Sequence, residues 1–239
     1  MNLTLVSCSK KSKKDIINTP IYKSYKKLNK INAIDDKIIF TSNKKGLPLV
    51  YNQARKIITS NIKNNLYKKE DEYIIFVHDD VYITDIFIKE KLQKAFEKFD
   101  IVGVAGSVII NLGLERIGWH LASKEYLSGS VEHVVNNKQE DSPTFWTYFG
   151  PTPKKVSVID GVFIAVKYKS IIDKNVKFDE QFTFDLYDID FCISAIKSNL
   201  EIGTSNIHLT HLSQGEGINE NRYIKAENLL RKKYAKQNT

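Results

Sequence analysis

The chain has 239 residues, of which 42% are hydrophobic and 27% charged, a composition that excludes both a disulfide-held mini-protein and a disordered tail. The net charge of +8 is uneven: residues 1–70 hold 16 basic and 4 acidic side chains, against 20 and 24 in the remainder. That lysine-rich part suits nucleic acid, an anionic membrane surface or a phosphorylated small molecule, or is simply a solvated surface. Only four basic residues are arginines, which disfavours a dedicated nucleic-acid reader because arginine reads guanine edges and clamps phosphates.

Cys8 and Cys192 are the only cysteines, too few for a disulfide framework and without the spacing of a zinc site, so we expect a reducing cytoplasmic setting. No apolar stretch reaches the roughly 20 residues that a membrane span requires. The first residues turn lysine-rich instead of forming the apolar core of a signal peptide. The sequence therefore predicts a protein that is soluble, or bound peripherally at the inner face of the membrane.

Short apolar runs alternate with helical patterns along the chain, which is typical of an α/β sheet with crossover connections. We expect strands over residues 3–7, 37–41, 73–77, 101–105, 156–159, 162–166 and 202–209. We expect helices over residues 49–62, 84–99, 189–198 and 219–235. The stretch between the two halves, rich in glycine, proline and aromatic residues, is interpreted as a loop-rich insertion over residues 111–153.

These elements predict one α/β domain over residues 1–239, with a mainly parallel sheet flanked by helices. Its nucleotide-binding half would span 1–110, its acceptor-side half 111–215, and a basic C-terminal helix would lie within 216–239. Because ligands of open α/β sheets sit at the carboxyl ends of the strands, residues that follow apolar runs are the first candidates for a site.

The first candidate site follows the unbroken apolar run of residues 73–77, where the chain continues as His78-Asp79-Asp80. Two adjacent carboxylates at a strand end are costly unless a positive charge compensates them. A divalent cation that holds a diphosphate is such a charge, because Mg²⁺ and similar ions are commonly held by one or two carboxylates and substrate phosphates. The alternative is that Asp79 and Asp80 only end the strand in a solvated turn.

The second candidate is the acidic run from Asp185 to Asp190, just before a helical pattern. One of its carboxylates, directed into a cleft, would serve as a general base. The alternative is helix capping, for which aspartate at the first position contributes about 1 kcal/mol. We assign capping to Asp190 and the base to Asp188.

The third candidate is a pair of histidines, His208 and His211, followed by Ser213, Gln214 and Gly215. A lone histidine is more often packed or solvated than a ligand. A metal held by the carboxylates after residue 77 nevertheless needs further ligands, and imidazole suits such an ion. Of the two histidines we favour His211 as the metal ligand.

Several blocks, in this order along the chain, resemble a known family. They are Leu49-Val50-Tyr51-Asn52-Gln53-Ala54, Tyr73 to Val81, Ile101 to Ser107, Asp160-Gly161-Val162-Phe163-Ile164-Ala165, Phe178-Asp179-Glu180, Tyr187-Asp188-Ile189-Asp190-Phe191-Cys192, and His211-Leu212-Ser213-Gln214-Gly215. Together they resemble bacterial glycosyltransferases with the GT-A fold, specifically the family-2-like group whose metal motif reads His-any-Asp-Val. Each block is weak alone, whereas their shared order over most of the chain is specific.

The resemblance implies a GT-A (Rossmann-like) α/β fold and the transfer of a sugar from a nucleoside diphosphate, with a UDP-sugar favoured, to an acceptor hydroxyl. It implies inversion at the anomeric carbon, a Mn²⁺ or Mg²⁺ cofactor, and a role in surface polysaccharide or glycoconjugate synthesis. The acceptor would be a saccharide or a lipid-linked saccharide, and nucleic acid would not be a partner. The basic C-terminal helix would suit an anionic membrane that carries such an acceptor.

The resemblance also assigns roles to single residues. Asp80 would contact the metal, with Asp79 as the variable middle residue of the Asp-x-Asp motif and His211 closing the coordination sphere. Ser7 and Asn52 would lie near the nucleotide. For the remaining two residues, Asp160 would lie near the donor sugar or the acceptor, and Asp188 would be the catalytic base.

The chain departs from the family pattern at two places. His78 stands where many relatives carry the first aspartate of the motif, and Thr41-Ser42-Asn43-Lys44 lacks the aspartate common for nucleotide contact. In the insertion, aromatic residues suit the apolar face of a pyranose or form hydrophobic cover for the sheet, and Trp146 is the first choice for an acceptor contact.

Two other kinds of protein remain as alternatives. A nucleotidyltransferase shares a related core but usually needs a glycine-rich phosphate loop after the first strand, and Ser7-Cys8-Ser9-Lys10-Lys11-Ser12 has lysines without glycine. A non-catalytic protein that binds nucleotide sugars or nucleic acid would use the same basic front end. A nucleic-acid binder would lose affinity steeply with salt.

Overall fold

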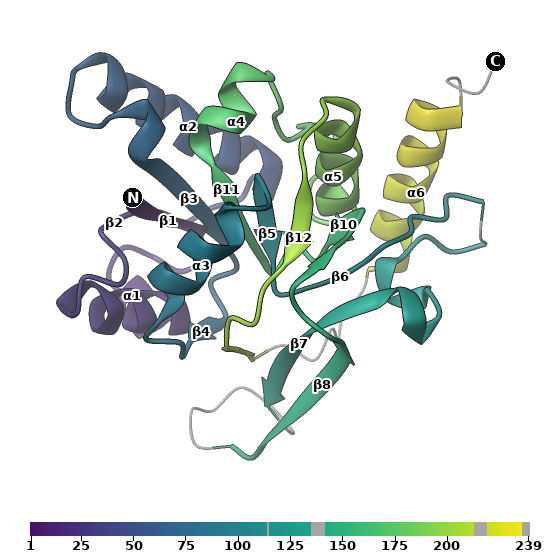
Figure 1. Cartoon of the computed structure of the whole chain (residues 1–239), viewed down its shortest axis with the longest axis horizontal. Coiled ribbons are helices and arrows are strands. Elements are labelled where there is room, and N and C mark those ends of the chain that lie inside the picture. The colour runs from purple at the N-terminus through teal and green to yellow at the C-terminus, as the bar shows by residue number, and fades with distance from the viewer. Residues whose placement is uncertain (114, 135–141, 213–218, 236–239) are drawn as a thin grey trace.

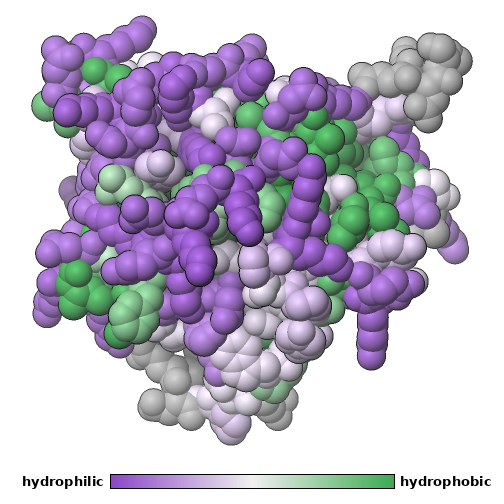
Figure 2. Space-filling view, in the orientation of Figure 1, coloured by the Kyte–Doolittle hydropathy of each residue, from purple (hydrophilic) through white to green (hydrophobic). Residues whose placement is uncertain are grey.

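The computed structural model describes residues 1–113, 115–134, 142–212 and 219–235. Figure 1 shows a central sheet with helices packed against it and a smaller sheet below it. None of the helices in the described part of the chain is long and apolar enough to cross a membrane. Figure 2 shows a mostly hydrophilic surface on this face of the molecule, with hydrophobic patches between the hydrophilic residues.

The larger sheet has the strand order β2-β1-β3-β11-β5-β12-β9 within the described residues. Its strands are β1 (Asn2–Cys8), β2 (Asp36–Phe40), β3 (Glu72–Val77), β5 (Ile101–Gly103), β9 (Lys154–Lys155), β11 (Phe163–Lys167) and β12 (Ile202–Thr204). Strands β2, β1, β3, β5 and β12 share one direction, while β11 and β9 run antiparallel to their neighbours. The predicted α/β class with a mainly parallel sheet is therefore confirmed.

The smaller sheet has the order β10-β6-β7-β13-β4, with β8 paired to β7. Its strands are β4 (Val81–Ile83), β6 (Ala105–Ser107), β7 (Leu127–Val134), β8 (Thr144–Gly150), β10 (Val158–Ile159) and β13 (Leu209–His211). The segment interpreted as a loop-rich insertion, residues 111–153, contains two strands of this sheet, β7 and β8. Strand β8 is mostly exposed, so it carries no apolar alternation that would mark it as a strand.

The helices are α1 (Pro20–Lys30), α2 (Leu47–Lys63), α3 (Ile88–Phe96), α4 (Tyr168–Asp173), α5 (Tyr187–Lys197) and α6 (Glu220–Ala235), with short 3₁₀ turns at Ile16–Asn18, Lys69–Asp71, Trp119–Leu121 and Lys124–Tyr126. Helix α1 has no counterpart among the predicted helices. Thr19 caps it by accepting a hydrogen bond from the amide of Tyr22, and Pro20 occupies its first turn.

One edge of the larger sheet collects the polar side chains that follow its strands. The parallel strands β1, β3 and β5 deliver their carboxyl ends there. Strand β11 runs the other way, so its first residue, Phe163, pairs with the last residue of β3, Val77. The antiparallel pairing therefore brings the Asp160-Gly161 turn beside His78, whose amide donates to the carbonyl of Val162 at 3.3 Å.

Candidate active site

His78, Asp80 and His211 bring their ligand atoms within 4.8 Å of one another. His78 and Asp80 follow β3, and His211 ends β13, which pairs with β4 so that His211 lies opposite Val81. The amide of Leu212 donates to the carbonyl of Asp80 at 3.0 Å and closes this contact. The structure thus joins the first and third sequence candidates into one half-buried cluster, and we call these three residues the triad.

The triad has the donor chemistry of a divalent-cation site. Asp80 Oδ1 is buried and accepts no hydrogen bond in the described part of the chain, although His211 Nε2 lies 3.3 Å from it. Burial works to raise the pKa of Asp80, but the two histidines outweigh it and hold that pKa below its usual value. Two imidazoles and one carboxylate are ligands that first-row divalent ions accept, so the residues fit such an ion.

The protonation of the two histidines differs because their surroundings differ. Burial lowers the pKa of His78, which favours the neutral imidazole that a metal requires. For His211 burial acts in the same direction, but the Asp80 carboxylate outweighs it and raises the pKa. Because a metal binds the neutral imidazole, a cation bound at the triad would release the proton of any protonated His211.

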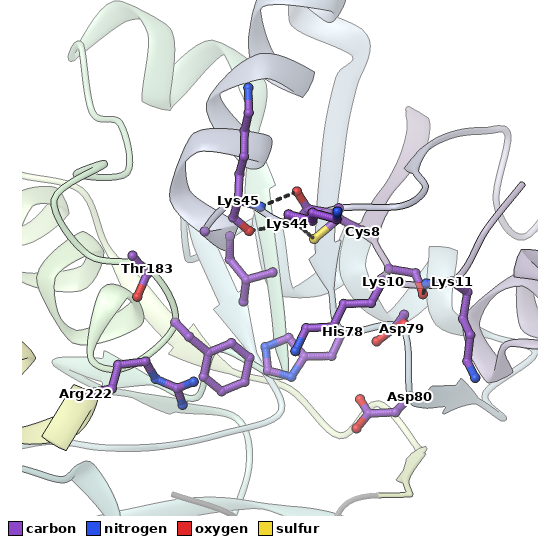
Figure 3. A pocket seen from close by; sticks show the side chains of 15 residues that line it. Cys8, Lys10, Lys11, Lys44, Lys45, His78, Asp79, Asp80, Thr183 and Arg222 are labelled. Atoms are coloured by element: carbon purple, nitrogen blue, oxygen red, sulfur yellow. Dashed lines mark hydrogen bonds between the residues drawn. The ribbon is translucent and has the colours of Figure 1, made fainter. Parts of the chain in front are cut away.

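A cavity of about 550 Å³ opens beside the triad (Figure 3). It is lined by residues from the ends of β1 and β3, from the β2–α2 connection and from the segment before α5, and its cationic residues are Lys10, Lys11, Lys44, Lys45 and Arg222. His78, Asp79 and Asp80 line it from the strand end. The cavity thus combines a set of cations with two members of the triad.

Arg222, on α6, lines this cavity, and its guanidinium lies over the ring of Phe184, which in turn lies beside the ring of His78. Its guanidinium lies 4.8 Å from the centroid of the Phe184 ring, and that ring lies 5.6 Å from the ring of His78. Asp185 accepts two hydrogen bonds from the same guanidinium, one of them at 3.0 Å. Figure 3 shows Arg222 across from Asp79 and Asp80, with His78 between them. The acidic run therefore contributes a positioning group for Arg222, which the sequence did not indicate.

Asp160 and Asp188 form a second pair of carboxylates at the same edge. Asp160 accepts hydrogen bonds from Val162 N at 2.8 Å and from Trp119 Nε1 at 2.9 Å. Asp188, in the first turn of α5, accepts from Gly161 N at 2.8 Å and from Ile189 N at 2.9 Å. Burial, and then the charge of Asp160, raise the pKa of Asp188 to about 7. A carboxylate poised near neutral pH has the basicity suited to proton transfer.

Tyr187 connects the two groups of acidic residues. Its hydroxyl donates to the carbonyl of Gly161 at 2.8 Å and lies 3.2 Å from His78 Nε2. A Cβ atom at position 161 would lie 2.4 Å from that hydroxyl, so the contact requires glycine there. The triad and the Asp160–Asp188 pair are therefore parts of one connected site.

Ser7 and Asn52, expected near the nucleotide, do not line this cavity. Ser7 is fully buried in β1, whereas the next residues, Cys8 and Ser9, do line it. Asn52 lies on α2, where its amide donates to the carbonyl of Phe178 at 2.8 Å. A buried amide must find hydrogen-bond partners, and here these partners are in the protein.

Three further points of the sequence analysis concern Asp190, His208 and the residues after His211. The capping role of Asp190 is wrong: the residue before α5 is Leu186 without a side-chain cap, and Asp190 instead accepts from Lys233 at 2.7 Å and from Tyr234 at 2.8 Å. His208 is exposed and contacts Asn206 rather than the triad. The residues expected to follow His211 in the site, namely Ser213, Gln214 and Gly215, lie outside the described residues.

Strands β13, β7 and β8 carry a row of rings that the sequence did not reveal. His211 pairs with His133 across β13 and β7, and His133 pairs with Phe145 across β7 and β8. The ring centroids are 5.9 Å apart in the first pair and 5.5 Å in the second, which is stacked. Paired residues share a face of the sheet, so Phe145 lies on the same side as His211.

Trp146 lies on the opposite face of the smaller sheet. It pairs with Glu132 across β8 and β7, and Glu132 pairs with Thr210 across β7 and β13. The ring centroids of Trp146 and His208 are 5.5 Å apart. The alternation of a strand thus separates the aromatic cluster of residues 145–149 into two faces. Phe145 and Phe149 lie on the face of β8 that is on the same side of the sheet as His211. The ring centroids of Phe149 and Trp119 are 4.9 Å apart.

Solved structures with similar chain arrangements share little sequence with this chain. Residues 1–349 of S. aureus TarS match with 15% identity and a TM-score of 0.47, covering 89% of this chain and 60% of that one. The catalytic domain of Drosophila beta1,4galactosyltransferase 7, in complex with xylobiose, matches with 9% identity and a TM-score of 0.46, covering 94% and 79%. A glycosyltransferase involved in the glycosylation of the major capsid of PBCV-1 matches with 8% identity and a TM-score of 0.35, covering 96% and 100%.

These structural similarities assign no substrate to this chain. A comparison with curated protein sequences found no match. The family comparison is made on the sequence itself. Residues 47–234 match the sequence model of a family described as "Glycosyltransferase like family", which includes α2, both carboxylates after β3, the Asp160–Asp188 pair and most of α6. Because the match covers well over half of the 239 residues, the chain belongs to this glycosyltransferase-like family, as its sequence motifs predicted.

Proposed function

We propose that the protein transfers a sugar, with inversion, from a nucleoside diphosphate sugar to an acceptor hydroxyl, and that it uses Mn²⁺ or Mg²⁺. The observation that carries this proposal is the triad of His78, Asp80 and His211 beside a cavity lined with cationic side chains. A nucleoside diphosphate brings the complementary features, because it has two phosphates that need positive charge and oxygens that bind a divalent ion. A UDP-sugar is the favoured donor.

The donor half of the site recognises charge. Lys10 and Lys11 follow β1, and Lys44 and Lys45 precede α2, so these lysines would place positive charge around the diphosphate and nucleotide. Arg222 adds a guanidinium whose orientation is held by Asp185. A divalent ion held by the triad would supply further positive charge to the leaving diphosphate.

The acceptor half of the site removes a proton. The acceptor oxygen would form its bond to the anomeric carbon as the bond from that carbon to the diphosphate oxygen breaks, which inverts the configuration. The hydroxyl proton would pass to Asp188, whose amide donors at Gly161 and Ile189 fix its orientation. The pKa of about 7 keeps a substantial fraction of Asp188 ionised near neutral pH.

The acceptor would approach over the smaller sheet. Phe145 and His133 lie on the same side of that sheet as His211, and aromatic rings suit the apolar face of a saccharide. A lipid-linked saccharide in surface polysaccharide or glycoconjugate synthesis would bring the protein to the inner face of the membrane. Flotation with anionic liposomes tests this part, and flotation that is independent of anionic lipid contradicts it.

The central experiment is a thermal-shift screen of nucleotide sugars with and without Mn²⁺ or Mg²⁺. We expect one donor class to raise the melting temperature in a metal-dependent way, and the same donor to yield a transferred or hydrolysed sugar in a labelled assay. Shifts that are equal with and without metal would contradict the metal role. Tight binding of RNA with a steep salt dependence, without any effect of nucleotide sugars, would contradict the enzyme.

A further inference from the structure

Arg55 on α2 is a buried cation without an anionic partner. Only 8% of its surface is exposed, and no carboxylate lies within ion-pair distance of it in the described part of the chain. Its single side-chain hydrogen bond runs from Nη1 to Asn52 Oδ1 at 3.2 Å, and its Nε is buried without a partner. A guanidinium has five N–H donors, and burying it unpaired is costly.

A cavity of about 260 Å³ opens beside this guanidinium. Two further cations, Lys56 and Lys177, line it, and both are exposed at their ends. The only carboxylate in its lining is that of Glu180, which already accepts a hydrogen bond from Asn52 Nδ2 at 2.9 Å. The side chains that line the cavity therefore carry a net positive charge. Among the described residues, the buried Nε of Arg55 has no hydrogen-bond partner.

This cavity is distinct from the donor cavity. The two have no lining residue in common. The donor cavity lies at the first residues of α2, Gly46 and Leu47, whereas the smaller cavity uses residues from Asn52 to Thr59, one to three turns later in the helix. An anion in the smaller cavity would not occupy the place of the donor diphosphate.

We propose that Arg55, Lys56 and Lys177 bind a small oxyanion, either free phosphate or a phosphate monoester, in this second cavity. The guanidinium fork of Arg55 presents paired donors that match two oxygens of a phosphate. The two lysines add charge from the solvent side, from α2 and from the segment after α4. The bound anion joins α2 to residues 177–180 and so stabilises the folded chain.

The test measures phosphate binding to the full chain by titration calorimetry and by the shift in melting temperature. Wild type, Arg55→Met and two control variants are compared. Lys63→Met removes an exposed cation of the same helix that does not line the cavity, and Lys45→Met removes a cation of the donor cavity. Arg55→Met keeps an unbranched side chain without the buried charge, a type of replacement that is often tolerated.

We expect phosphate to bind wild type and the Lys63→Met variant with similar affinity, and the Lys45→Met variant to retain the binding that depends on Arg55. Arg55→Met should lower that affinity by about tenfold or more, the loss expected when hydrogen bonds to a charged group are removed. If Arg55→Met does not fold, the double variant Lys56→Gln with Lys177→Gln gives the readout, because both side chains are exposed, and it should lower the affinity as well.

Three results overturn the proposal. The first is that wild type does not bind phosphate, and the second is that wild type and Arg55→Met bind it equally. The third is that Lys45→Met loses phosphate binding while Arg55→Met keeps it. In the second arm, glucose 1-phosphate replaces inorganic phosphate. Tighter binding of the ester identifies a phosphate monoester as the ligand, and tighter binding of inorganic phosphate identifies the free ion.

Discussion

The amide of Gly161 donates a 2.8 Å hydrogen bond to Asp188 Oδ2. The proposed base is thereby tied to the residue that follows Asp160, so the two carboxylates bind neighbouring amides of one turn, those of Gly161 and Val162. Burial and this neighbouring charge together raise the pKa of Asp188 to about 7, far from its ordinary value of 3.8. The hydrogen bond fixes the position of the Asp188 carboxylate. The charge of Asp160 helps to set the pH range in which Asp188 is ionised.

Asp188→Asn should abolish transfer while leaving donor binding intact. The amide keeps the size of the side chain but cannot take the acceptor proton, so we expect kcat to fall by about 10²–10⁴-fold. UDP affinity, measured by calorimetry with Mn²⁺, should stay close to that of wild type. Asp190→Asn is the matched control on the same helix, because its side chain faces Lys233 and not Asp160. Full transfer activity in Asp188→Asn would exclude this residue as the base.

The same substitution should stabilise the protein at neutral pH. The folded state holds a proton on Asp188 up to about pH 7, whereas an unfolded aspartate releases it near pH 3.8. Stability is therefore lost as the pH rises between these two values, and Asp188→Asn escapes this loss. In metal-free buffer the melting temperature of the variant should exceed that of wild type at about pH 7.5 by at least about 2–4 °C, the equivalent of 1 kcal/mol in a chain of this size.

The pH dependence of that difference is the control. It should shrink towards zero below about pH 3, where Asp188 is protonated in both the folded and the unfolded state. A difference that stays constant from acid to neutral pH would show that the amide stabilises the fold for another reason.

The metal site is tested by comparing two histidines of one region. His211→Ala removes a triad ligand, so UDP binding should lose its enhancement by Mn²⁺ and resemble that of wild type in a chelator. His208→Ala removes an exposed side chain outside the triad, and the metal enhancement should persist. Calorimetric titrations with and without Mn²⁺ measure both. Equal enhancement in the two variants would remove His211 from the site.

The two faces of β8 predict different effects on the acceptor. Phe145→Ala removes a ring stacked on His133, on the His211 side, and should raise the acceptor KM by about 2–10-fold. Trp146→Ala removes a ring on the opposite face and should leave that KM unchanged. Kinetics with a saccharide found in the transfer screen, together with melting temperatures, separate acceptor recognition from stability. The reverse result would restore Trp146 as the acceptor contact.

Much of the metal-binding edge follows from local sequence. The apolar run of residues 73–77 has to be buried, and the polar His78, Asp79 and Asp80 can only follow it at the edge of the sheet. The sequence also favours His211 over His208 as a further ligand for that metal. The three-residue strands β4 and β13 that place it beside Asp80 carry no pattern of their own.

Contacts between distant segments could not be predicted. Asn52 is a polar residue near the start of a helix, and nothing nearby in the chain shows that the backbone of Phe178 uses its amide. The strand β8 was missed because its side chains are exposed on both faces, which leaves no alternation of apolar and polar residues. The pairing of His133 with both His211 and Phe145 depends on the register of three strands, which a single sequence does not contain.

The hairpin of β7 and β8 contributes no described residue to the donor cavity, and β8 is attached to the fold through β7 alone among the described strands. Side chains of β8 that do not contact Trp119, His133 or His208 can therefore change with little effect on the rest of the fold. In the proposed transferase, such changes would leave the lining of the donor cavity intact. For engineering, a library confined to residues 144–149 would sample new acceptors with the donor-binding half held constant.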